Sequence, residues 1–145
     1  MIAIACDHGG YDLKAQLIEH LREKGVELKD FGCGAGERVD YPPYAEAVAR
    51  GVAEGTYEKG ILICGTGIGM SIAANKIPGI RAALCADCYS AEVTRLHNDS
   101  NILCMGGRTI GPELAKKITD IWLETPFSEM EHHAHRIALI SELEK

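Results

Sequence analysis

Short apolar segments alternate with longer amphipathic segments from one end of the chain to the other. The apolar, β-branched segments, which predict strands, are residues 2–6, 26–31, 60–64, 80–85 and 101–105. The amphipathic segments, which predict helices, are residues 10–24, 42–54, 66–76, 89–98 and 111–122. In the first of these helices Leu13, Leu17 and Leu21 share one face. Strands that alternate with helices in this way are typical of βαβ units and a parallel sheet.

A final amphipathic segment, residues 128–143, is not followed by another strand. We therefore expect a single doubly wound, Rossmann-like α/β domain over residues 1–145, with three layers, a five-stranded parallel sheet and one additional C-terminal helix. The additional helix is free to cross to a partner subunit. No Ser/Gly-rich linker, repeat or low-complexity tract divides the chain, so we predict no domain boundary.

Composition and charge argue against several classes of protein. The 145 residues are 46% hydrophobic and 25% charged, which is ordinary for a folded globular domain. The net charge of −6, with no basic run longer than Lys116-Lys117, argues against a nucleic-acid partner. No uncharged stretch is long enough to span a membrane, and no basic segment precedes the apolar start as it does in a signal peptide. We therefore expect a cytoplasmic protein whose six cysteines are reduced thiols.

Glycine and polar residues gather where the predicted strands end, which is where ligands bind in an open parallel sheet. The segments there are Cys6-Asp7-His8-Gly9-Gly10, Cys64-Gly65-Thr66-Gly67-Ile68-Gly69 and Met105-Gly106-Gly107-Arg108. The alternating glycines of residues 65–69 allow backbone N–H groups to point at an anion. A dinucleotide-binding motif would need glycine in place of Met70, and no Gly-Lys-Ser/Thr follows as in a P-loop. A glycine-rich turn that only permits tight packing is the alternative.

The cysteines fall into three groups. Cys64 stands between a predicted strand and the start of a helix, a position that favours the thiolate, so it is a candidate base or nucleophile. Cys6, Cys33 and Cys104 are expected to be small buried residues. Cys85-Ala86-Asp87-Cys88 has C-x-x-C spacing, but no second pair completes a zinc site. Ordinary packing is the favoured interpretation of that pair, and a thiol redox protein is the alternative.

Acid–base and phosphate-binding candidates lie at other element ends. Asp7 and His8 suit acid–base chemistry or a hydroxyl-rich ligand, and equally a turn with a surface histidine. His97 is either a helix-end cation or an acid–base group. Arg108 and the segment His132-His133-Ala134-His135-Arg136 suit a phosphate dianion, although a solvated helix face would have the same composition.

Several of these segments, in this order and spacing, resemble the type B ribose-5-phosphate isomerases. They are Cys6-Asp7-His8-Gly9-Gly10, Asp40-Tyr41-Pro42, residues 63–69 with Ala73-Ala74-Asn75-Lys76, and His97-Asn98-Asp99-Ser100-Asn101. The resemblance extends over essentially the whole chain, and the wider family includes galactose-6-phosphate and allose-6-phosphate isomerases. It implies interconversion of D-ribose 5-phosphate and D-ribulose 5-phosphate through an enediolate, after ring opening, with no cofactor and no metal.

The resemblance also implies catalytic roles. Cys64 would be the general base that moves a proton between C2 and C1, and Thr66 would assist it by hydrogen bonding near the reacting oxygens. The backbone of residues 65–69 would stabilise the charge of the enediolate. His97 would protonate the ring oxygen, and Asp7 would accept the proton of the anomeric hydroxyl.

Further residues match the family's binding positions. Asn98 would hold sugar hydroxyls, His8, Arg108 and Arg136 would bind the phosphate, and the site would be completed across a homodimer interface. One position departs from the family's Arg-His-x-x-Arg motif: this chain has His132 where the motif has its first arginine. A histidine binds phosphate well only when it is protonated. A 6-phosphohexose isomerase and a sugar-phosphate sensor without catalysis are the alternative functions.

Overall fold

The computed structural model describes residues 1–145 and contains one five-stranded sheet in the order β2-β1-β3-β5-β4. The strands are β1 (Ile2–Cys6), β2 (Leu28–Asp30), β3 (Lys59–Cys64), β4 (Ala82–Leu84) and β5 (Ile102–Gly106). Every neighbouring pair is parallel, which confirms the predicted fold class. The edge strands β2 and β4 have three residues each, shorter than the predicted 26–31 and 80–85, because each pairs with only one neighbour.

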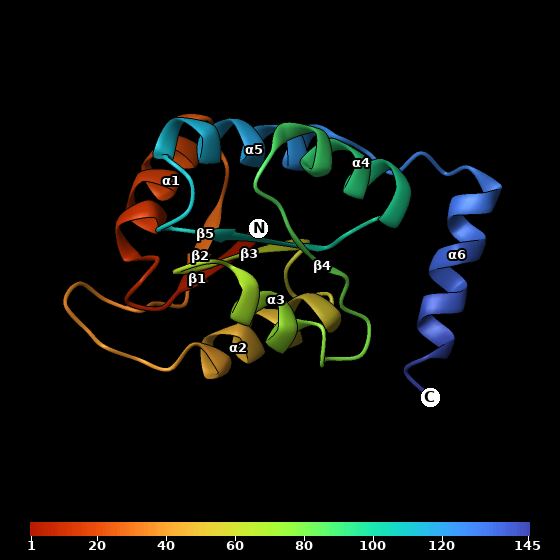
Figure 1. The fold of residues 1–145 in the computed structure, drawn as a ribbon, viewed down its shortest axis with the longest axis horizontal. Coiled ribbons are helices and arrows are strands. Elements are labelled where there is room, and N and C mark those ends of the chain that lie inside the picture. The colour runs from red at the N-terminus through yellow and green to blue at the C-terminus, as the bar shows by residue number, and fades with distance from the viewer.

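Helices cover both faces of the sheet and give the three predicted layers (Figure 1). The helices are α1 (Tyr11–Glu23), α2 (Tyr41–Ala53), α3 (Ile68–Ala74), α4 (Cys88–Asn98), α5 (Pro112–Glu124) and α6 (Glu131–Glu142). On one face α5 packs against α1 and α4, and on the other α2 packs against α3. None of the helices is long and apolar enough to cross a membrane.

Each face of the sheet has its own apolar core, because successive side chains of a strand point to opposite faces. In β3, Ile61 and Ile63 belong to the core under α1 and α5, which is closed by the fully buried Trp122. Leu62 and Cys64 belong to the core under α2 and α3. The central strands β1, β3 and β5 therefore form the rigid framework from which the loops at both sheet ends extend.

Helix α6 lies beside the three layers instead of within one of them (Figure 1). It is attached near its start, where Ser128 N–H donates to the carbonyl of Leu96 and His133 packs against His97. It is attached again beyond its end, where Gly79 N–H donates to the Glu144 carboxylate at 2.9 Å. Most of the helix surface is exposed, as expected for an element with a free face.

Candidate active site at the carboxyl ends of the strands

The chain reverses its winding direction between the adjacent strands β1 and β3. From β1 it enters α1 on one face of the sheet, and from β3 it enters α3 on the other. Such a point leaves a crevice beyond the carboxyl ends of the two strands, where ligands bind in doubly wound folds. Asp7 directly follows β1 and Cys64 is the last residue of β3, so both lie at this crevice.

Three glycine-containing loops interlock around the crevice. A Cβ atom at Gly9 would lie 2.9 Å from the Gly65 nitrogen, and one at Gly107 would lie 2.5 Å from the carbonyl oxygen of Gly9. Gly107 N–H donates to the Cys64 carbonyl at 2.8 Å, and Arg108 N–H donates to the Gly65 carbonyl at 2.9 Å. The glycines are needed for this close approach, and the loops after β1, β3 and β5 together form one fixed rim.

The Cys64 sulfur is the nucleophilic atom held by this rim. Its residue is only 5% exposed, and Gly67 N–H donates to Sγ at 3.1 Å. Gly67 adopts φ +81°, a left-handed conformation that suits glycine and turns its N–H back toward the end of β3. The amide thus fixes the sulfur and points at the atom that becomes negative when the thiol gives up its proton.

Three polar side chains lie on the same rim as the sulfur. Asp7 is buried, and its Oδ1 accepts the N–H of Gly9 at 2.8 Å. His8 Nδ1 accepts the N–H of Val39 at 3.3 Å, so its neutral ring carries the proton on Nε2, which can donate to a ligand. The guanidinium of Arg108 lies over Gly65, with Nη1 3.4 Å from the position of a Cβ there.

Thr66 lies in the loop between Cys64 and α3. Its Oγ1 accepts the N–H of Ile68 at 3.2 Å, which keeps the hydroxyl on the loop with its proton free to be donated. The structure therefore brings together one set of the predicted residues, which we call the thiol group: Asp7, His8, Cys64, Thr66, the backbone of residues 65–69, and Arg108.

The other predicted residues form a second cluster, which we call the histidine group: His97, Asn98, His132 and Arg136. The ring of His97 lies 4.3 Å from that of His133, measured between ring centroids, and the ring of His132 lies 4.1 Å from that of His133. Arg136 is close enough to influence the charge of His133. Residues from the end of α4 and the start of α6 thus gather at one place.

The two groups lie at opposite ends of the sheet. The carbonyl of Asn98 accepts a hydrogen bond from Arg81, which immediately precedes β4 at the amino ends of the strands. Cys64 is paired with Gly106 at the carboxyl end of β5, four residues after Ile102. At about 3.3 Å per residue these ends are about 13 Å apart. One copy of the chain therefore does not bring the thiol group and the histidine group into one pocket.

His133 is not a member of the histidine group, but its ring packs against two of the members, His97 and His132. The sequence does not distinguish it from its neighbours. It is 8% exposed, and its Nδ1 is 2.8 Å from Ser128 Oγ. Burial, together with the nearby charges of His132, His97 and Arg136, lowers the pKa of His133 below the usual value. A lowered folded-state pKa means that this ring favours folding while it is neutral, and that acidification weakens the packing of α6 on α4.

The remaining cysteines have packing roles, as expected. Cys85 is buried, which raises its pKa to about 11, so its thiol is protonated at neutral pH. Cys88 begins α4, directly after Asp87, whose side chain caps the helix by accepting Ser90 N–H at 2.7 Å. All six cysteines are free. No cluster of three or more His, Cys, Asp or Glu side chains is arranged to hold a metal ion.

Comparisons with known proteins identify close relatives along nearly the full length. A family model described as Ribose/Galactose Isomerase matches residues 2–140. Ribose-5-phosphate isomerase B of Escherichia coli K12 is 51% identical over 144 residues, covering 99% of this chain and 96% of that protein. D-erythrulose-4-phosphate isomerase of Pectobacterium atrosepticum is 45% identical over 127 residues, covering 87% and 84%. The structure of Clostridium thermocellum ribose-5-phosphate isomerase B superimposes with a TM-score of 0.96 at 49% identity, covering 99% and 96%.

Proposed function

This chain belongs to the ribose/galactose isomerase family and is an aldose–ketose isomerase, and from that premise we propose how its residues interconvert D-ribose 5-phosphate and D-ribulose 5-phosphate. The observation that carries the proposal is the Cys64 sulfur, held by the Gly67 amide at the end of β3. We propose that residues 1–145 act as a single isomerase domain. Its six free thiols fit a reducing compartment such as the cytoplasm.

Ring opening comes first because ribose 5-phosphate in water is mainly a cyclic hemiacetal. Asp7 accepts the proton of the anomeric hydroxyl, and His97 gives a proton to the ring oxygen as the bond between that oxygen and C1 breaks. The products are the C1 aldehyde and a free hydroxyl on C4. Asn98 holds the sugar hydroxyls during this step.

Proton transfer between carbons follows. The Cys64 thiolate removes the proton from C2, and the electron pair moves through C1 to the carbonyl oxygen, giving an enediolate. The backbone N–H groups of residues 65–69 that do not already donate to Cys64 Sγ or Thr66 Oγ1 stabilise its negative charge. The proton is then returned to C1 while the hydroxyl proton moves from O2 to O1 with help from Thr66, leaving a ketone at C2. Exchange with solvent then removes the proton that Asp7 gained and replaces the one that His97 gave, so atoms and charge are conserved over the cycle.

We propose that the working unit is a homodimer, or a dimer of dimers, in which the thiol group of one protomer meets the histidine group of its partner. The separation of the two groups within one chain supports this arrangement. So do exposed apolar side chains on α3 and α6, among them Ile68, Ile72, Leu139 and Ile140. His8 and Arg108 of one protomer and His132 and Arg136 of the other would then bind the phosphate.

A coupled assay on the purified protein tests the substrate. D-ribose 5-phosphate, D-allose 6-phosphate and D-galactose 6-phosphate are compared at equal concentrations without added metal. We expect kcat/KM to be highest for ribose 5-phosphate. A preference for a hexose phosphate would assign the 6-phosphohexose specificity instead, and binding without turnover would assign a sensor.

The role of His97 predicts a difference between substrates that form rings and those that cannot. In D-erythrulose 4-phosphate and its aldose the phosphate blocks the hydroxyl that would close a five-membered ring, so no ring must be opened. We expect His97→Asn to lower kcat/KM for ribose 5-phosphate by about 10²-fold or more, the usual contribution of a general acid. Turnover of erythrulose 4-phosphate should be nearly unchanged. Equal losses on both substrates would remove the ring-opening role.

His132 predicts that a permanent charge at its position strengthens substrate binding. A guanidinium is always charged and matches a phosphate with two donors, whereas an imidazole does not. His132→Arg should therefore show a lower KM for ribose 5-phosphate than the natural protein, with little change in kcat. An unchanged KM in that variant would contradict a phosphate contact by His132.

A further inference from the structure

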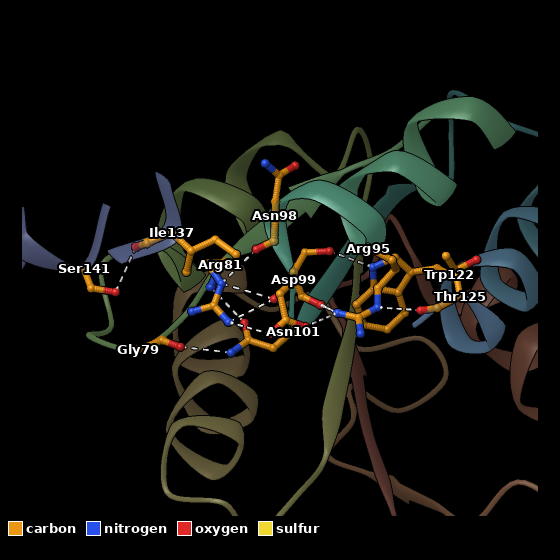
Figure 2. Close-up of polar contacts among 11 residues, drawn as sticks. Gly79, Arg81, Arg95, Asn98, Asp99, Asn101, Trp122, Thr125, Ile137 and Ser141 are labelled. Carbon is orange, nitrogen blue, oxygen red and sulfur yellow. Dashed lines mark hydrogen bonds and ion pairs between the residues drawn. The ribbon is translucent and has the colours of Figure 1, made fainter. Parts of the chain in front are cut away.

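The side chain of Arg81 lies against the C-terminal end of α4 (Figure 2). Its Nε donates to the carbonyls of Asn98 at 3.0 Å and Asp99 at 3.1 Å, and its Nη2 donates to the Asp99 carbonyl at 2.9 Å. Nη2 also lies 3.7 Å from the Asp99 carboxylate. One guanidinium thus binds the last carbonyls of the helix that carries His97.

These carbonyls need an external partner. The last carbonyls of a helix accept no hydrogen bond from an N–H of the same helix. Asp99 ends α4 in a left-handed conformation with φ 46°. Arg95 holds the other side of the same residue, with Nη1 2.9 Å from Asp99 Oδ1 and 2.6 Å from the Ser100 carbonyl (Figure 2). The segment that follows His97 is therefore clamped between two arginines.

The two arginines differ in their surroundings. Arg95 is 6% exposed, donates to the Thr125 carbonyl and lies over the ring of Trp122, so it belongs to the packing of α4 on α5. The Arg81 side chain is 23% exposed and lines a cavity of about 480 Å³ between the amino end of β4 and α6. Loss of Arg81 should leave the apolar core intact, whereas loss of Arg95 should not.

The position of Arg81 is itself fixed by the sheet. Its N–H donates to Asn101 Oδ1 at 2.8 Å, and the Asn101 side chain donates to the Gly79 carbonyl at 2.9 Å. The Arg81 carbonyl accepts hydrogen bonds from the N–H of Asn101 and from that of Ile102, the first residue of β5. Arg81 therefore links the framework of the sheet to the backbone of Asn98 and Asp99.

We propose that Arg81 is a positioning residue for ring opening: it fixes the end of α4 so that His97 and Asn98 are held at the sugar bound by the partner's thiol group. The inference rests on the proposed function of His97. Arg81 itself touches no reacting atom. Displacement of a reacting group by about 1 Å can lower a rate by about 10²-fold, so a modest shift at the helix end is enough to matter.

The test compares Arg81→Gln and Arg81→Lys with the natural protein. We expect Arg81→Gln to lower kcat for ribose 5-phosphate by about 10-fold to 10²-fold, because the helix end loses its anchor. The lysine variant should recover part of the loss, since one ammonium can still donate to a carbonyl. Melting temperature and dimer mass should change little. Arg50→Gln is the matched control: Arg50 is an exposed arginine paired with Glu46 on α2, and its loss should not change kcat.

A double-mutant cycle distinguishes positioning from a general effect on the fold. If Arg81 acts mainly through His97, the loss caused by Arg81→Gln should be much smaller in a His97→Asn background than in the natural protein, and only the part that acts through Asn98 should remain. Multiplication of the two losses, or an unchanged kcat in Arg81→Gln alone, would overturn the positioning role. An unchanged rate in His97→Asn alone would instead remove the proposed role of His97, so the two failures are distinguishable.

Discussion

Cys64→Ala should lower kcat for D-ribose 5-phosphate by about 10²-fold to 10⁴-fold, the contribution usual for a positioned base. In the mechanism that we propose, the sulfur takes the C2 proton, and a methyl group cannot do so. Binding should persist, because the proposed phosphate and hydroxyl contacts come from other residues. Calorimetric titration of the variant with ribose 5-phosphate should therefore give a dissociation constant near the KM of the natural protein.

The neighbouring thiol of Cys104 provides a matched control. Cys104 is fully buried, and burial raises its pKa far above the usual value, so it stays protonated. Cys104→Ala removes a similar volume from the same apolar core and should cost about 1 kcal/mol of stability while leaving kcat largely intact. Loss of substrate binding in Cys64→Ala, or an equal loss of kcat in Cys104→Ala, would recast Cys64 as a packing residue.

Two nearly inactive variants should restore activity when they share a dimer. A hybrid dimer contains one Cys64→Ala protomer and one His97→Asn protomer. One of its two sites combines the Cys64→Ala change of the first protomer with the His97→Asn change of the second, and is inactive. The other site combines the natural cysteine of the second protomer with the natural histidine of the first, and is active. Random exchange of subunits makes about half of the dimers hybrids with one good site of two, so about a quarter of the natural activity should return. Refolding the two proteins together and assaying the mixture measures this.

The control for this experiment pairs two changes within the thiol group. Cys64→Ala mixed with Thr66→Ala leaves one change in each site of the hybrid, so no activity should return. Recovery in that mixture, or none in the first one, would contradict the sharing of each site between protomers. Mass photometry of both mixtures confirms that subunits have assembled.

The sequence predicted the fold well where a residue's surroundings repeat along the chain. The periodic Leu13, Leu17 and Leu21 placed α1, and the apolar runs placed all five strands. The lengths of β2 and β4 could not be predicted, because a strand at the edge ends where its single neighbour stops pairing, which local sequence does not encode. The sequence predicts that the rim glycines gather at the strand ends. It does not predict the contact of Gly9 with Gly65, because the two residues are far apart in the chain.

The candidate site was predicted in part. Cys64 and its glycine loop stood out because nucleophile and loop are adjacent in sequence. Arg81 carried no comparable signal, since its partners are backbone carbonyls that any sequence possesses. His133 was hidden among similar neighbours, and only the docking of α6 on α4 distinguishes the buried ring from exposed ones.

In the homodimer that we propose, the placement of the thiol group and the histidine group at opposite ends of the sheet should make catalysis depend on protein concentration. Dilution that separates the protomers should lower the specific activity, because each proposed site needs residues from both protomers. A sugar phosphate that contacts both protomers also stabilises their association. By reciprocity it strengthens their association by the same factor by which association strengthens its binding. Substrate should therefore slow dissociation of the protomers, so that the proposed dimer is most stable at saturating substrate.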